Sequence, residues 1–266
     1  MNLLSEIISR KRQLVQTAKQ LVPLEHLREV SRHVRSGAPA HALRKALSPS
    51  DSIKVIAEFK RRSPSKGVIR AEADPVEIAR EYVEAGAAGI SVLTEENYFD
   101  GSLDDLRSIT NAVELPVLRK DFIFDRYQIH EAAGAGADAV LLIVAALEDR
   151  NLTVLREVVE DELGMDALVE VHDESELQRA VACGATTIGV NNRNLRTFDV
   201  SIDTSFRLVG QAPPESLLVS ESGLNSAEDL QRLRRAGYKG FLIGESLMSA
   251  PSPGTALRAL LSWWQG

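Results

Sequence analysis

The chain has a single cysteine, few aromatic side chains and no long hydrophobic run. One residue of 266 is Cys, and aromatic residues make up 5% of the composition. One cysteine cannot form an internal disulfide, so Cys183 fits a protein of the reducing cytoplasm. The opening segment MNLLSEIISRKRQ carries Glu6 and Arg10 where a signal peptide needs an apolar core. We therefore expect a cytoplasmic protein that is neither exported nor inserted in a membrane.

The chain also lacks an excess of basic residues and any metal-ligand pattern. Its 31 Lys and Arg are outnumbered by 38 Asp and Glu, which gives a net charge of -7 and a pI of about 5.4. Nucleic-acid-binding domains usually have the opposite balance, so we expect no nucleic-acid partner. The 5 histidines show no ligand spacing, which predicts no zinc or iron site.

What the sequence does contain is an internal repeat. A glycine follows a helix-like segment and precedes an apolar run in EAGAAGISVL, AGAGADAVLL, ACGATTIGV and RAGYKGFLIG. These glycines recur about every 50 residues, and further apolar runs lie between them in KVIAEF, LPVLRKDF, ALVEV and SLLVSES. Two strands in each of the four repeats predict eight strands. We expect them at 53–59, 89–94, 116–122, 138–144, 166–171, 186–191, 216–221 and 240–243.

Amphipathic segments separate these apolar runs. Examples are DPVEIAREYVEAG, SLDDLRSITNAV, TVLREVVEDELG, ESELQRAVACG and SAEDLQRLRRAG. Continuous apolar strands that alternate with helices indicate a parallel sheet. A doubly wound open sheet has the same alternation, but no G-x-G-x-x-G follows the first strand, and the fourfold spacing favours closure. We therefore predict an α/β fold, a (β/α)8 TIM barrel.

Residues 1–48 precede the first predicted strand. They contain two helix-like segments, LLSEIISRKRQLVQTAKQ and PLEHLREVSRHVRS, which join near Pro23. We expect an N-terminal helical extension at 1–48, packed on a barrel at 49–266, so that the whole forms one structural domain. At the other end we interpret Trp263 and Trp264 as helix packing rather than an interaction patch.

Polar residues end several of the predicted strands. Active sites of barrels form at the carboxyl ends of the strands, and side chains along a strand alternate between two faces. Because of this alternation, a polar residue two or four positions from an inward-facing apolar residue also faces inward. Four strands end with a polar residue at such a position, and Lys60 shares a face with the polar residue that ends the first strand. The inward polar residues are Glu58, Lys120, Glu170 and Asn191, and Glu221 with Ser222 ends the seventh strand.

Each of these residues alone can be read as part of a structural salt bridge. Together they point to another role, because buried ions cost several kcal/mol each unless they are paired, and such groups are where proteins tune pKa values. We therefore predict a catalytic group of lysine and glutamate side chains. For Arg119, Asp121 and His172, whose parity we assign outward, we expect structural salt bridges instead.

Glycine-containing turns follow the last two predicted strands, at 221–224 (ESGL) and 243–246 (IGES). Each turn leads into a helix-like segment, and glycine there lets backbone NH groups approach an anion at a helix N-terminus. One such glycine can be a steric requirement alone. The pair, on strands seven and eight of a barrel, predicts a phosphate site and a small phosphorylated substrate.

Seven long segments of the chain match one family. They are IAEFKRRSPSKG (56–67), LTEENYFDGSLDDL (93–106), LPVLRKDFIFDRYQI (115–129), LVEVHDESEL (168–177), IGVNNRNLRTFDVSIDTS (188–205), VSESGL (219–224) and FLIGESLM (241–248). By these segments the sequence resembles the indole-3-glycerol phosphate synthases of tryptophan biosynthesis. The resemblance implies a lyase that needs no cofactor. Such an enzyme closes a ring in 1-(2-carboxyphenylamino)-1-deoxyribulose 5-phosphate, with loss of carbon dioxide and water, to give indole-3-glycerol phosphate.

The resemblance also implies roles for the site residues. Lys120 would protonate the ketone oxygen during ring closure, and Lys60 would lie near the substrate carboxylate and act in dehydration. Glu170 would be the acid/base partner of Lys120. Glu58 and Asn191 would stabilise the dehydrating intermediate, and Glu221 and Ser222 would complete the floor. Phosphate and sugar would be held by Ser63, Arg193, Gly223, Gly244 and the NH of Glu245, whose carboxylate would point away.

Two other functions stay open at this level. A Schiff-base lyase or aldolase would use Lys120 or Lys60 as a nucleophile on a sugar-phosphate ketone. A catalytically silent barrel would bind a metabolite, or a partner protein through the terminal SWWQ. Lysine and glutamate at five strand ends argue against the silent barrel. Because the sequence ends at Gly266, we expect no fused phosphoribosylanthranilate isomerase domain.

Overall fold

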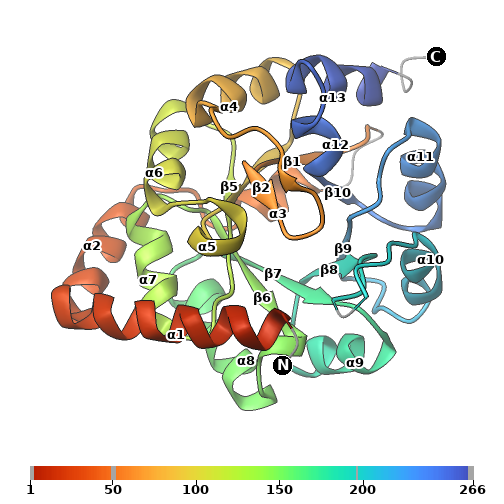
Figure 1. The fold of residues 1–266 in the computed structure, drawn as a ribbon. Helices are drawn as coiled ribbons and strands as arrows, with labels where there is room; N and C mark the ends of the chain where they lie inside the picture. The colour runs from red at the N-terminus through yellow and green to blue at the C-terminus, as the bar shows by residue number, and fades with distance from the viewer. Residues whose placement is uncertain (1–2, 49–51, 196, 263–266) are drawn as a thin grey trace.

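A computed structural model describes residues 3–48, 52–195 and 197–262. Eight parallel strands close into a barrel in the order β1-β10-β9-β8-β7-β6-β5-β4, with helices around it (Figure 1). The predicted (β/α)8 barrel with N-terminal helices is therefore confirmed. Trp263 and Trp264 lie outside the described residues. The barrel strands are β1 Val55–Phe59, β4 Gly89–Leu93, β5 Val117–Lys120, β6 Ala139–Ile143, β7 Asp166–Val171, β8 Thr187–Asn191, β9 Leu217–Glu221 and β10 Gly240–Ile243.

Each predicted strand coincides with an observed one to within a residue or two at its ends. Nearly every strand residue is buried, because side chains fill the inside of the barrel and helices cover its outside. Several outer helices begin at a side-chain cap, such as Asp74, Ser102, Asp173 and Ser226. The outer helices are α4 Pro75–Glu84, α6 Leu103–Ala112, α7 Arg126–Gly134, α8 Asp149–Glu157 with a π-helical turn Val158–Glu162, α9 Glu174–Ala182, α10 Asp203–Val209, α11 Ala227–Ala236 and α13 Pro253–Ser262.

The N-terminal end of the barrel is closed by a short helix that the sequence patterns did not predict, α3 Ala42–Ala46. Leu43 and Leu47 are fully buried there and belong to the same apolar group as the inward residues of the strands. The fit is close, since a Cβ atom on Gly89 would lie 2.9 Å from Leu43 Cδ1, and one on Gly240 would lie 3.2 Å from Leu47 Cδ2. Residues 42–47 thus form the floor of the barrel interior.

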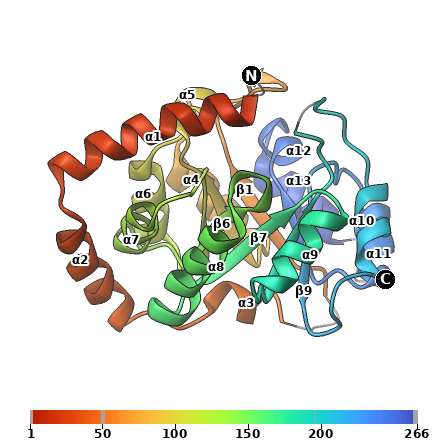
Figure 2. The same cartoon turned by 90° about the horizontal axis from the view of Figure 1, so that it is seen from below.

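The first two helices, α1 Leu3–Leu21 and α2 Leu24–Ser36, match the two predicted helices of the extension. Figure 2 shows α1 lying across one end of the barrel, while α3 lies at the other end. Helix α2 packs along α7. Lys19 of α1 forms an ion pair of 2.6 Å with Asp125, the cap of α7. Helix α1 therefore covers the end of the barrel where an active site is expected.

Short elements complete this end of the barrel. They are a two-stranded hairpin of β2 Arg62–Ser63 and β3 Gly67–Val68, the helices α5 Glu96–Phe99 and α12 Glu245–Met248, and the 3-10 turn Val144–Ala146. All are too short to show a periodic pattern in the sequence. No helix among the described residues is long and apolar enough to cross a membrane.

Candidate active site

A cavity of about 280 Å³ opens where the carboxyl ends of the strands meet. Its wall includes residues from the loops that follow most of the strands and from α1 and α12, so distant parts of the chain converge there. The lining contains every residue that the sequence predicted for the site. These are Glu58, Lys60, Ser63, Lys120, Glu170, Asn191, Arg193, Glu221, Ser222, Gly223, Gly244 and Glu245.

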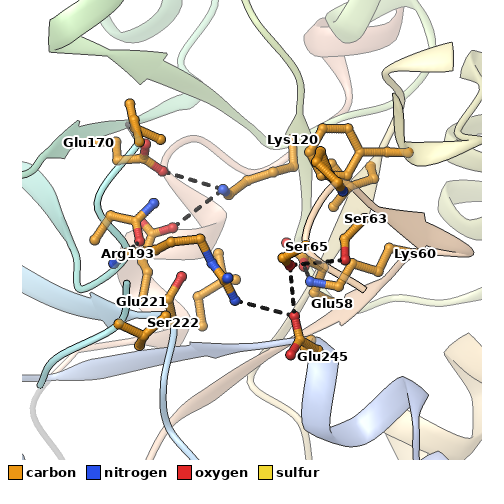
Figure 3. A pocket seen from close by; sticks show the side chains of 18 of the residues that line it. Glu58, Lys60, Ser63, Ser65, Lys120, Glu170, Arg193, Glu221, Ser222 and Glu245 are labelled. Carbon is orange, nitrogen blue, oxygen red and sulfur yellow. Dashed lines mark hydrogen bonds and ion pairs between the residues drawn. The ribbon is translucent and has the colours of Figure 1, made fainter. Parts of the chain in front are cut away.

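Lys120 lies between two carboxyl groups at the centre of the cavity. Its Nζ atom is 3.3 Å from Glu170 Oε2 and 3.4 Å from Glu221 Oε2 (Figure 3). Burial lowers the pKa of Lys120, but the charges of Glu170, of Glu58 and, when it is ionised, of Glu221 outweigh burial and raise the pKa above its ordinary value. The side chain is therefore an ammonium ion at neutral pH, which is the form that donates a proton.

The two carboxyl groups beside Lys120 differ in their preferred protonation state. Burial raises the pKa of Glu170, but Lys120, His172 and a hydrogen bond from Asn191 outweigh burial, so the net pKa is lowered. Burial raises the pKa of Glu221 to about 8, and the nearby charges of Glu170 and Glu58 add to this. At neutral pH Glu170 is thus an ionised base, while Glu221 holds its proton. Neighbouring carboxyl groups whose pKa values are shifted in opposite directions are typical of acid–base sites.

Glycine makes room for these carboxyl groups at two places in the barrel. Gly189 on β8 lies against Glu221, and a Cβ atom there would overlap the carboxyl oxygen Oε1. A Cβ atom on Gly244 would overlap the side chain of Glu58 in the same way. Any larger residue at either position would push a carboxyl group out of the cavity floor.

Lys60 and Glu58 form a second lysine–glutamate pair. Lys60 Nζ lies 2.8 Å from Glu58 Oε1, and Ser91 Oγ donates to Glu58 Oε2 at 3.4 Å. The Lys60 side chain is 12% exposed and comes from the loop after β1, on another side of the cavity from Lys120 (Figure 3). The cavity therefore contains two separate lysine side chains, each paired with at least one glutamate.

The turn after β9 has an unusual backbone. Ser222 and Gly223 both adopt a left-handed conformation, with φ of 66° and 74°. Such angles are costly for serine, and a side chain at position 223 would also overlap Val200. Asn192, which the sequence analysis did not single out, holds the turn by donating from Nδ2 to the Ser222 carbonyl at 3.1 Å. The backbone here is therefore fixed in one shape at the cavity edge.

Arg193 and Glu245 pair across the mouth of the cavity. The guanidinium Nη2 atom lies 3.2 Å from Glu245 Oε2, and Ser65 Oγ lies 3.5 Å from the same oxygen (Figure 3). Lys66 Nζ lies 3.9 Å from the other oxygen of this carboxylate. We expected this carboxylate to point away, but it faces Arg193 on the cavity lining. Glu245 thereby joins the hairpin after β1 to the loop after β8.

Much of the cavity lining is apolar, and the sequence analysis missed it. The rings of Phe99 and Phe122 lie 6.4 Å apart between their centroids. The sequence analysis considered only polar strand ends and overlooked these side chains, although Phe122 directly follows Arg119, Lys120 and Asp121 at the end of β5. Helix α1 contributes Leu3, Leu4 and Ile7 to the cavity lining, and their spacing of three and four residues places them on one face of the helix. The apolar lining consists of Leu3, Leu4, Ile7, Leu93, Phe99, Phe122, Leu141, Ile143, Leu195, Phe198, Val200, Leu224, Leu242 and Ile243.

The residues expected to form structural salt bridges divide into two groups. Arg119 pairs with Asp121 at 3.0 Å and with Glu131 at 2.8 Å, which confirms the salt bridges expected for Arg119 and Asp121, although Asp121 also contributes to the cavity lining. His172 forms the expected ion pair, with Glu176 at 3.0 Å, and does not line the cavity, but its ring does not turn fully outward. It lies two positions after Glu170, so it shares the same face, and its Nε2 atom lies 3.4 Å from Glu170 Oε1. Among the described residues no group of three or more His, Cys, Asp or Glu is arranged to hold a metal ion.

The protein is a closed barrel whose cavity contains paired lysine and glutamate side chains and an apolar lining. These features are typical of barrel enzymes that work by acid–base catalysis. The family model described as "Indole-3-glycerol phosphate synthase" matches residues 4–260. The chain belongs to this family.

Curated relatives with the same description agree over nearly the full chain. The one from Bacteroides thetaiotaomicron is 47% identical over 260 residues, which covers 98% of this chain and 98% of the relative. The one from Carboxydothermus hydrogenoformans is 46% identical over 263 residues, with 97% and 99% covered. The one from Koribacter versatilis is 54% identical over 209 residues, with 79% and 80% covered.

A solved structure with a similar shape is the thiamine phosphate pyrophosphorylase from Pyrococcus furiosus. Its TM-score is 0.58 at 16% sequence identity, and the match covers 81% of this chain and 98% of that one. This likeness reflects the shared barrel fold and carries no argument about the reaction.

Proposed function

We propose that this protein closes the indole ring of 1-(2-carboxyphenylamino)-1-deoxyribulose 5-phosphate, with loss of carbon dioxide and water, to give indole-3-glycerol phosphate. The observation that carries the proposal is the position of Lys120 between Glu170 and Glu221, inside the cavity of a chain that belongs to the synthase family. The reaction needs a proton donor and a base near one another, and no bound cofactor.

The chemistry of the cavity suits the three parts of this substrate. The aromatic ring fits the apolar lining near Phe99 and Phe122, since burial of a ring is favourable there. Its carboxylate is attracted by Lys60. We assign the phosphate to the turns after β9 and β10, where Gly223 and Gly244 leave the backbone NH groups accessible and Arg193 adds a positive charge.

Ring closure is the first step. A bond forms between the ring carbon that carries the carboxylate and the ketone carbon of the sugar. As it forms, the charged Lys120 gives a proton to the ketone oxygen, which becomes a hydroxyl group. The carboxylate then leaves as carbon dioxide, and its bonding electrons restore the aromatic ring. Protonation of the ketone oxygen prevents negative charge from building up there, and this lowers the activation barrier of ring closure.

Dehydration completes the indole. The new hydroxyl group leaves as water after a lysine gives it a proton, and a base takes a proton from the carbon next to the nitrogen. Glu170 is the ionised carboxylate in position to be that base, because its pKa is lowered. Glu58 and Asn191 orient the intermediate, and Glu221 with Ser222 forms the floor of the cavity.

The raised pKa of Lys120 argues against a Schiff-base lyase, because a lysine must be neutral to attack a ketone. The buried lysine and glutamate side chains of the cavity argue against a catalytically silent barrel, because burial of charged groups lowers the stability of the folded protein unless they are paired, and a silent barrel would not need them.

The test is direct conversion of the carboxyphenylamino sugar phosphate, followed by indole fluorescence. The expected result is product and carbon dioxide in equal amounts without added metal or cofactor. No indole product from the folded protein would refute the proposal.

A further inference from the structure

Two different loops supply parts of the proposed phosphate site. Arg193 belongs to the loop after β8, and Gly223 belongs to the turn after β9; both residues line the cavity. A phosphate group that contacts both needs the two loops at a fixed distance from one another, because hydrogen bonds weaken when their length and angle depart from the ideal. A group that holds these two loops together would therefore control the binding of phosphate.

Asn192 is placed to hold the two loops together. It directly precedes Arg193, it is buried, and it does not line the cavity. Its backbone NH donates to the Glu221 carbonyl at 2.9 Å, and its own carbonyl accepts from the Ser201 NH at 3.1 Å. Its side-chain Nδ2 donates to the Ser222 carbonyl at 3.1 Å. Asn192 thus connects the start and the end of the loop after β8 to the turn after β9.

A closed ring of hydrogen bonds fixes the orientation of the Asn192 amide. Ser205 of α10 donates to Asn192 Oδ1 from its backbone NH at 3.1 Å and from its hydroxyl group at 2.9 Å. Asn192 Nδ2 donates to Ser220 Oγ at 3.1 Å, and the hydroxyl oxygens of Ser220 and Ser205 lie 2.8 Å apart. Because the Ser205 hydroxyl gives its one proton to Asn192, Ser220 donates the last bond of the ring.

This arrangement explains why the position needs an asparagine. The backbone NH of Ser205 can only donate, and the backbone carbonyl of Ser222 can only accept, so the side chain between them must be an acceptor on one side and a donor on the other. Aspartate lacks the donor, and an apolar side chain lacks both groups.

The turn after β9 depends on this support because of its backbone. Ser222 and Gly223 both have left-handed φ angles, of 66° and 74°. Such angles are unfavourable for serine, so other interactions must hold the turn in this shape. Without the hydrogen bond from Asn192 to the Ser222 carbonyl, the turn would relax and the Gly223 NH would move away from the phosphate.

We propose that Asn192 is a positioning residue for phosphate binding, which holds the turn after β9 and Arg193 where both contact one phosphate group. The inference rests on the phosphate site of the proposed function and on no other step of the reaction. Asn192 lies behind the cavity wall, so it touches neither the phosphate nor the reacting atoms. Its effect should therefore appear in the affinity for substrate and not in the chemical steps.

The first experiment compares Asn192→Asp with the wild-type protein. Aspartate keeps the acceptor for Ser205 but cannot donate to the Ser222 carbonyl, so the turn is released. We expect KM to rise about tenfold, with kcat changed less than about threefold, because a lost hydrogen bond to a buried group has an effect of this size. Equal KM in the variant and the wild-type protein would overturn the proposal, and so would a loss confined to kcat.

Two further variants separate positioning from the effect of an added negative charge. Asn194→Asp makes the same change in the same loop, at an exposed residue that keeps its acceptor for the Thr197 NH. Its KM should stay within about threefold of the wild-type value. Asn192→Ala adds no charge and should raise KM as Asn192→Asp does. A rise of equal size in Asn194→Asp, or a wild-type KM in Asn192→Ala, would contradict the positioning role.

The second experiment needs no turnover and uses two probes. Inorganic phosphate represents one end of the substrate, and 2-aminobenzoate represents the other. In Asn192→Asp and Asn192→Ala the Kd of phosphate should rise about tenfold, while the Kd of 2-aminobenzoate should stay within about threefold. A similar weakening of both probes would mean a general loss of structure and would overturn the proposal.

A third measurement uses the wild-type protein alone, so it serves also if the variants do not fold. Inorganic phosphate should shift the backbone amide NMR signals of Arg193 and Gly223 with one Kd, and the side-chain NH2 protons of Asn192 should exchange slowly with solvent. Shifts at only one of the two loops, or rapid exchange at Asn192, would contradict the proposal. Absence of indole product despite these shifts would refute the proposed function instead, so the two failures are distinguishable.

Discussion

Lys11 of α1 lies 3.1 Å from Asp121, the residue that follows Lys120 at the end of β5. Both side chains are almost completely buried, at 3% and 0% exposure. Burial raises the pKa of Asp121, but Lys11 and Arg119 outweigh it and lower the pKa to about 2. The carboxylate therefore stays charged, and it ties the helix that covers the cavity to the strand that carries the central lysine.

Replacement of Lys11 should loosen this connection. Lys11→Met leaves Asp121 with only part of its compensating charge, and we expect a loss of about 3 kcal/mol in the free energy of unfolding. KM should rise as well, because α1 supplies Leu3, Leu4 and Ile7 to the cavity. Urea unfolding and steady-state kinetics measure both effects. Arg10→Met, the neighbouring residue in an exposed pair with Glu6, should change stability by less than about 0.5 kcal/mol.

Truncations can separate the two ends of the proposed extension, residues 1–48. Removal of residues 1–22 should raise KM about tenfold and leave a folded barrel, because α1 covers the cavity without joining the sheet. Removal of residues 1–48 should also destabilise the barrel by several kcal/mol, because Leu43 and Leu47 fill its floor. Circular dichroism melts and KM values compare the two truncated proteins with the full chain. Equal KM for the shorter truncation and the full chain would show that α1 does not contribute to binding.

Lys120 should act as a proton donor and form no covalent adduct. Lys120→Ala should lose at least about a thousandfold in kcat with a smaller change in KM, as expected for a group that stabilises the transition state. Borohydride added with substrate should label no lysine, as mass spectrometry can verify. A reduced adduct on Lys120, together with loss of activity, would favour the Schiff-base mechanism.

Glu170 and Glu221 should respond differently to the same substitution. Glu170→Gln removes an ionised base and should cost about 100-fold or more in kcat. Glu221→Gln replaces a carboxyl group that is already protonated at neutral pH and should cost less. The stability that Glu221 contributes is present below its unfolded pKa near 4.5 and is lost as the pH rises through its folded pKa of about 8. Glu221→Gln should therefore remove this decline, which unfolding measurements between pH 5 and pH 9 can test.

The charges at the mouth should affect binding more than chemistry. Arg193→Ala removes a cation next to the proposed phosphate site and should raise KM about tenfold with little change in kcat. Glu245→Gln keeps a hydrogen-bond partner for Arg193 and leaves the backbone NH in place, so its KM should stay within about threefold of the wild-type value. Inorganic phosphate as a competitive inhibitor gives the same comparison without turnover. A larger effect from Glu245→Gln than from Arg193→Ala would contradict this assignment.

Regular alternation explains which parts of the site could be predicted. Lys120 and Glu170 lie on strands, where side chains alternate in direction, so position along the strand indicates which residues face inward. The pairing of Arg193 with Glu245 joins the loop after β8 to the start of α12, and no sequence period relates these two segments. Phe122 has the same parity as Lys120 in the predicted strand 116–122, so alternation would have pointed it inward, and it was missed because only polar residues at strand ends were considered.

The same limit applies to the fold. The strands and long helices have periodic apolar patterns, so they could be predicted with nearly correct ends. Helix α3 has five residues and shows no period, yet it supplies part of the barrel floor. Its role depends on the space left inside a closed barrel, which is a property of the assembled strands and not of the segment itself.

This floor also constrains how the chain can fold as it is synthesised. Leu47 precedes the first strand but packs against Gly240 in the last one, so its final contacts join nearly opposite ends of the chain. A nascent chain that lacks β10 has neither a closed sheet nor a complete place for Leu47. Contacts between such distant residues slow folding and leave apolar surface exposed while it proceeds. The last step of folding therefore waits until β10 has left the ribosome, and until then the leucines of the floor are available to chaperones.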